Sequence, residues 1–143
     1  MLLKLLTLAI GLCFSISAKA DTTDNYQIYI RKVLVRNDSG FPGNQKNQSF
    51  IEIDNSLLND SLEVHFNHCM NSVGKRRIVV VDTNSTKIKV FDFVTTYERR
   101  GMYIPISFFC NDPQIKTGIS YSLIYYEDEM KEGRFLTDIK VKK

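Results

Sequence analysis

The segment LEVHFN, residues 62–67, alternates apolar and polar side chains at every position. Leu62, Val64 and Phe66 fall on one face, and the polar residues between them fall on the other. A period of two is typical of a β-strand that packs one face against a core and exposes the other to water. This segment is the clearest strand of the chain and favours a sheet with one buried side.

Similar segments lie on both sides of residues 62–67, separated by polar turns. We expect strands at 26–35, 49–53, 62–67, 78–81, 88–94, 102–110, 119–126 and 135–141. A phase change near Arg31-Lys32 indicates a bulge in the first strand, and Pro105 marks residues 102–110 as an edge strand or a bulged one. With no amphipathic helical stretch, residues 21–143 are predicted to form one all-β domain, an antiparallel β-sandwich of seven to eight strands.

The first twenty residues have the pattern of a signal peptide. Lys4 supplies a positive start, residues 5–16 are apolar, and Ala18-Lys19-Ala20 is a cleavage motif. We expect cleavage after Ala20 and a secreted or periplasmic protein. The apolar stretch is shorter than the ~20 residues of a membrane span, and no later segment is longer, so we expect no transmembrane segment in the mature chain.

Two cysteines, Cys69 and Cys110, remain after the predicted cleavage. In an oxidising compartment such a pair usually forms a disulfide, which would add about 4 kcal/mol to the stability of the domain. Because each cysteine lies near the end of an expected strand, the bond could join two sheets. In this the chain resembles immunoglobulin-like domains, by analogy of architecture alone. It contains no tryptophan and therefore lacks their cysteine, tryptophan, cysteine order.

The charge of the chain argues against a nucleic-acid partner. The formal net charge of +3 falls by two when Lys4 and Lys19 leave with the signal peptide, and no nucleic-acid-binding motif is present. Basic residues nevertheless cluster at 75–77, at 99–100 and at the C-terminus. Such clusters usually keep strand ends soluble, and the functional alternative is contact with an anionic lipid, a glycan or an acidic protein.

The two histidines, His65 and His68, are the candidate residues for catalysis or metal binding. With Cys69 they offer the ligand types that zinc and copper prefer. However, His65 and His68 are three residues apart, so on an extended strand they face opposite sides. No G-x-S-x-G motif is present. We expect no catalytic residue, no metal site and no cofactor; a small secreted hydrolase or metal-binding protein using these histidines is the alternative.

Tyrosine is the enrichment that points to recognition, because its rigid apolar ring and polar hydroxyl suit interfaces. The expected binding surface comprises Tyr97, Arg99, Arg100, Tyr103 and Tyr126. We therefore expect an exported binding module that recognises a protein or a glycan, as an inhibitor, immunity-type or adhesion-type protein does. A structural subunit of a surface or envelope assembly is a further alternative. The sequence leaves the oligomeric state open.

Overall fold

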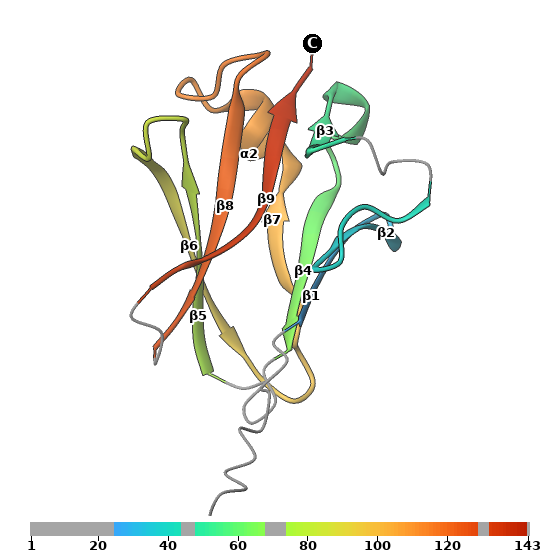
Figure 1. Cartoon of the computed structure of the whole chain (residues 1–143), viewed down its shortest axis with the longest axis vertical. Helices are drawn as coiled ribbons and strands as arrows, with labels where there is room; N and C mark the ends of the chain where they lie inside the picture. Colours follow the sequence, from blue (N-terminus) through green and yellow to red (C-terminus); the bar gives the residue numbers. More distant parts are fainter. Residues whose placement is uncertain (1–24, 44–47, 68–73, 129–131, 143) are drawn as a thin grey trace, which may run out of the picture.

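The computed structural model describes residues 25–43, 48–67, 74–128 and 132–142 and consists of two stacked β-sheets (Figure 1). Alternating apolar side chains line the inner faces of the sheets. One sheet has the strand order β2 (Val33–Asn37), β1 (Asn25–Ile30), β4 (Ser61–Asn67), β7 (Met102–Pro105). The other has the order β3 (Phe50–Ile53), β9 (Arg134–Val141), β8 (Ser120–Glu127), β5 (Gly74–Val81), β6 (Lys87–Thr95). The predicted all-β, two-layered architecture is confirmed, with nine strands among the described residues.

The core lies between the two sheets, and β4 contributes the face that its sequence predicts. Leu62, Val64 and Phe66 are buried, whereas Glu63 and His65 lie on the outer face. The Phe66 ring stacks on that of Tyr125 from the opposite sheet, with ring centroids 4.0 Å apart. Contact of this kind between inward-facing side chains is what holds a β-sandwich together.

One strand pair is parallel, which corrects the expectation of an antiparallel sandwich. β3 pairs with β9 in parallel, with Ile51 opposite Ile139. After β3 the chain passes through a short 3-10 helix, η2 (Asn55–Leu57), and enters β4 in the other sheet. β3 therefore pairs with the last strand of the chain and not with a neighbour in sequence. Turn residues indicate pairs of consecutive strands, so they do not identify this partner.

Arg31-Lys32 forms a two-residue hairpin turn, so the predicted bulge at this place is wrong. Both residues have left-handed backbones, with φ of 51° and 64°, as a type I′ turn requires. The turn places Ile30 opposite Val33 and separates β1 from β2. A register shift does occur in this hairpin, but it lies between Ile28 and Tyr29.

The expected strand at 102–110 ends at Pro105, and a helix, α2 (Ile106–Asn111), follows it. Pro105 precedes the first helical turn in an extended conformation, with φ of −64° and ψ of 130°. Ile106 and Phe109 are the buried residues of α2, and their spacing of three is that of one helix face. The alternation at 102, 104 and 106 does not distinguish a longer strand from a strand followed by a helix.

The predicted disulfide is not seen. Cys110 is a free cysteine on α2, with its Sγ 3.8 Å from the Asp54 carbonyl oxygen, and Cys69 lies outside the described residues. α2 follows Pro105, which pairs with Ser61 at the start of β4. A strand of this length spans about 20 Å, so Asn67 at its far end is much further from α2 than the ~7 Å between the Cα atoms of a disulfide.

None of the helices in the described part of the chain has the length and apolar character needed to cross a membrane.

Candidate functional site

The β-sheet pairing gathers two separate basic segments at one end of the sandwich. Gly74, the first residue of β5, pairs with Thr95, the last residue of β6. Lys75 therefore lies opposite Val94, and the loop 96–101 with Arg99 and Arg100 continues from the same place. Figure 1 shows this loop at the end of the molecule opposite the β5–β6 turn. We call Lys75, Val94, Tyr97, Arg99 and Arg100 the basic–aromatic end.

The loop at this end is held by its own backbone. The Thr96 N–H donates to the Arg99 carbonyl oxygen at 3.0 Å, and the Arg99 N–H donates back to that of Thr96 at 3.2 Å. The Arg99 N–H also lies 3.1 Å from the Thr96 hydroxyl oxygen. These contacts close residues 96–99 into a tight turn. The side chains of this turn are consequently presented on an ordered frame.

Two large apolar side chains are strongly exposed at the basic–aromatic end. Tyr97 is 74% exposed and Val94 is 72% exposed, and Arg99 and Arg100 beside them are exposed as well. Exposed aromatic side chains among arginines are typical of protein interfaces. Glu98 is the acidic residue of this loop. Three of the five residues expected to bind, Tyr97, Arg99 and Arg100, therefore lie together.

Tyr126, the fourth expected residue, lies on the outer face of the five-stranded sheet. It sits opposite Arg77 on β5, which in turn faces Asp92 on β6 in an ion pair of 3.1 Å. Tyr126 lines a hollow of about 540 Å³ whose other lining residues include Lys75 and Val94. The hollow thus reaches the basic–aromatic end, and its volume is in the range of small-ligand sites.

Tyr103, the fifth expected residue, faces away from the others on the outer face of the four-stranded sheet. Its hydroxyl donates to Glu63 Oε1 at 2.9 Å, and the same oxygen is 2.7 Å from His65 Nε2. Partial burial raises the pKa of Glu63, but hydrogen bonds from His65 and Tyr103 outweigh it, and the net shift is downward. The hydrogen bond to Glu63 raises the pKa of Tyr103.

The sequence also identified the basic segment 75–77, but it did not show which of its side chains are exposed and which are buried. Lys75 and Arg77 point outward, whereas Arg76 is 3% exposed and its Nη1 donates to the Phe66 carbonyl oxygen at 2.8 Å. Val94 was missed as a binding candidate, and Lys75 was named only as part of a basic cluster. The β-hairpin at 78–94 was the available signal, since extending its pairing outward brings these two residues together.

The alternative catalytic or metal site that would use both histidines stays untested. His65 lies on an open sheet face, bound to Glu63, with its ring edge-on to Tyr29 at 5.7 Å, and His68 lies outside the described residues. Among the residues that were placed, no cluster of three His, Cys, Asp or Glu side chains is positioned to hold a metal ion. The expectation that the chain is not an enzyme stays a prediction.

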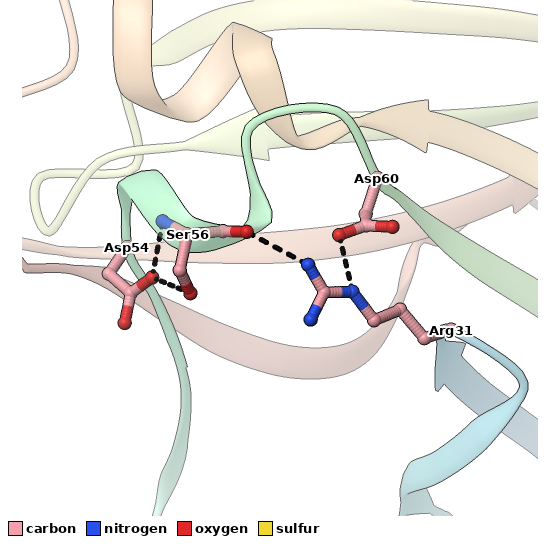
Figure 2. Close-up of polar contacts among 4 residues, drawn as sticks. All are labelled: Arg31, Asp54, Ser56 and Asp60. Atoms are coloured by element: carbon pink, nitrogen blue, oxygen red, sulfur yellow. Dashed lines mark hydrogen bonds and ion pairs between the residues drawn. The ribbon is translucent and has the colours of Figure 1, made fainter.

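A further polar cluster joins the β1–β2 turn to the loop after β3 (Figure 2). Arg31 Nε donates to Asp60 Oδ2 at 2.7 Å, and Arg31 Nη2 donates to the Ser56 carbonyl oxygen at 2.8 Å. Asp54 accepts from the Ser56 backbone N–H at 2.8 Å, and hydrogen bonds from Ser56 lower the pKa of Asp54. Because the guanidinium already binds acceptors of this chain, we interpret the cluster as a structural contact.

Comparison with known proteins gives no relative: no family model, no curated protein and no solved structure matches this chain. Its function is therefore argued from the geometry above.

Proposed function

We propose that the chain is an exported binding module that recognises an acidic surface of a partner protein through its basic–aromatic end. The single observation that supports this is the grouping of Val94 and Tyr97, both more than 70% exposed, with Lys75, Arg99 and Arg100. Burying these two apolar side chains on a partner removes them from water, which is the main favourable term in protein association.

The charged residues at this end determine the kind of partner. Arg99 and Arg100 can each bind a carboxylate through two parallel hydrogen bonds, and Lys75 adds a point charge. The mature chain as a whole is close to neutral, and Lys75, Arg99 and Arg100 form one of its local basic clusters. Local charge of this kind steers encounter with an acidic partner and selects its orientation.

The setting of the site supports a binding role. Loops at one end of a sandwich are where scaffolds of this architecture commonly carry recognition residues, as in the immunoglobulin-like analogy. The signal-peptide pattern of residues 1–20 supports export to the periplasm or the cell exterior. An inhibitor, an immunity-type protein and an adhesin all fit such a module.

The test is capture of a partner from the compartment into which the protein is exported, identified by mass spectrometry. The wild type is compared with Tyr97→Ala and with the double charge reversal Arg99→Glu/Arg100→Glu. The matched control is Lys87→Glu/Lys89→Glu, which makes the same change in charge on exposed residues at the other end of β6.

We expect the wild type and the control to capture the same acidic protein and both loop variants to lose it. Capture that survives the loop substitutions would contradict the proposal. Self-association of the purified domain in place of a partner would instead favour the structural-subunit alternative.

A further inference from the structure

The outer face of the four-stranded sheet carries a second, different group of side chains. Tyr29, Glu63 and Tyr103 lie directly opposite one another on three neighbouring strands, and Gln27 lies opposite His65 in the adjacent row. All five point away from the core. We call them the tyrosine face. None of them lines the hollow beside Tyr126.

Tyr103 is held in a fixed position with much of its ring still exposed. Its hydroxyl is bound to Glu63 Oε1 at 2.9 Å. Its ring lies over Gly101, where an added Cβ would be 3.0 Å from the nearest atoms of the Tyr103 side chain, so a side chain at this position would press on the ring. The side chain nevertheless stays 55% exposed. The result is an aromatic surface whose orientation is fixed before any ligand arrives.

Tyr29 is anchored on the other side of Glu63. Its hydroxyl donates to Gln27 Oε1 at 3.0 Å. Its ring meets the His65 ring edge-on, at 5.7 Å and 83°. The two tyrosines therefore flank the Glu63 carboxylate, and the Gln27 amide and the His65 imidazole lie in the adjacent row. Such an arrangement offers ring surfaces and hydrogen-bonding groups side by side on a flat sheet.

The charge of the tyrosine face selects among ligands. Glu63 is its acidic group; hydrogen bonds from His65 and Tyr103 and the positive charge of Lys32 lower the pKa of that carboxylate. Opposite charges thus offset one another on this face, unlike the basic–aromatic end. A ligand that matches it is uncharged, has an apolar surface for a ring, and is rich in hydroxyl groups.

We infer that the tyrosine face binds a neutral oligosaccharide. The C–H surface of one pyranose ring stacks on Tyr103, as aromatic rings favour for apolar surface. Sugar hydroxyls donate to Glu63 and Gln27 and accept from His65. These hydrogen bonds replace those that the same groups make to water in the free protein. Pre-organisation of Tyr103 lowers the entropy cost of binding. This site lies on another face from the one in the proposed function, so either can fail alone.

The test is titration of the mature chain with uncharged oligosaccharides, followed by NMR shifts of backbone amides. The probes are linear hexasaccharides of glucose, mannose, xylose, galactose and N-acetylglucosamine. Each is taken to about 10 mM, where a Kd of about 1 mM is close to saturation. Tyr103→Ala removes the ring, Glu63→Gln keeps the shape and removes the charge, and Tyr97→Ala is the control tyrosine outside this face.

We expect at least one neutral hexasaccharide to shift amides at 63, 65 and 103. Tyr103→Ala is expected to weaken its binding about tenfold or more, a loss of about 1.4 kcal/mol. Glu63→Gln weakens it less, and Tyr97→Ala leaves it unchanged. The inference is overturned if no neutral probe binds, or if Tyr103→Ala and the wild type bind equally. Binding of a protein partner at the basic–aromatic end bears on none of these outcomes.

Discussion

Glu63 uses one oxygen atom, Oε1, to hold both Tyr103 and His65. Each contact favours the ionised carboxylate, and together they lower the pKa of Glu63 despite its partial burial. The same hydrogen bond raises the pKa of Tyr103, because losing the phenol proton would place two negative charges side by side. At the scale of single residues, this carboxylate therefore organises the outer face of the four-stranded sheet.

The lowered pKa of Glu63 predicts how stability depends on pH. A carboxylate whose pKa is lower in the folded state adds stability above its ordinary value of 4.5, and this is lost as the pH falls through the folded-state value. Urea unfolding of the wild type and Glu63→Gln should show a difference in unfolding free energy that shrinks between about pH 6 and about pH 3. A difference that stays constant with pH would contradict this role.

Gly133 provides a second prediction for a single residue. An added Cβ would lie 2.3 Å from Tyr126 Cζ and 2.4 Å from Ile124 Cγ2. Gly133→Ala should therefore displace Tyr126 and destabilise the domain by about 1–3 kcal/mol, as overpacking typically does. Thermal or urea unfolding measures this. In the Tyr126→Ala background the same substitution should cost less; an equal cost in both backgrounds would show that the ring is not the obstacle.

The β1–β2 turn shows how one element can depend on strained backbone. Arg31 and Lys32 both have positive φ, a region that costs non-glycine residues about 1–2 kcal/mol. Arg31 offsets this through its contacts with Asp60 and Ser56 (Figure 2). Its charge pair with Asp60 is more than half exposed on the arginine side, and such pairs contribute about 0–1 kcal/mol.

Lys32→Gly should stabilise the domain by about 1 kcal/mol, because glycine adopts the left-handed conformation without strain. Arg31→Gly is the comparison at the neighbouring position. It relieves similar strain but removes the contacts with Asp60 and Ser56, so its gain should be smaller. Urea unfolding of the two variants gives both values. A destabilised Lys32→Gly would mean that the lysine side chain stabilises the turn.

The elements were predictable where local pattern alone decides them. Alternation identified β4 and its buried face, because every second side chain of a strand lies on the same face and the apolar ones lie on the face that contacts the core. Alternation failed at 102–110, where Ile106 suits both a continued strand and the first turn of α2. It also could not assign β3 to β9, since a parallel pair joins segments far apart in the chain.

The proposed binding site could be predicted in residue type and only partly in position. Tyr97, Arg99 and Arg100 share a short loop, so the sequence alone keeps them together. Their association with Lys75 and Val94 depends on the register of β5 with β6. The separation of Tyr103 from this group depends on which sheet β7 joins. The position of the site therefore depends on which strands pair and in which register, and local sequence pattern does not show this.

Over the whole molecule, β4 separates Asn67 at one end of the sandwich from α2 and Cys110 at the other. We therefore predict that Cys110 is a free thiol in protein from its natural source. Labelling with a maleimide without reductant, followed by peptide mass spectrometry, should find the label on Cys110. Burial and the nearby Asp54 charge raise the pKa of this thiol, so labelling should be slower in the native state than in denaturant. A peptide that links Cys69 to Cys110 would contradict this prediction.

Site-specific photo-crosslinking tests most directly whether the basic–aromatic end binds an acidic partner protein. A photoreactive amino acid replaces Tyr97 in one variant and Asn84, in the exposed turn at the far end of the same hairpin, in another. Both are illuminated in cells that export the protein. We predict a discrete adduct with an acidic protein from position 97, lost on Arg99→Glu/Arg100→Glu, and none from position 84. Identical adducts from both positions, or none from position 97, would contradict this prediction.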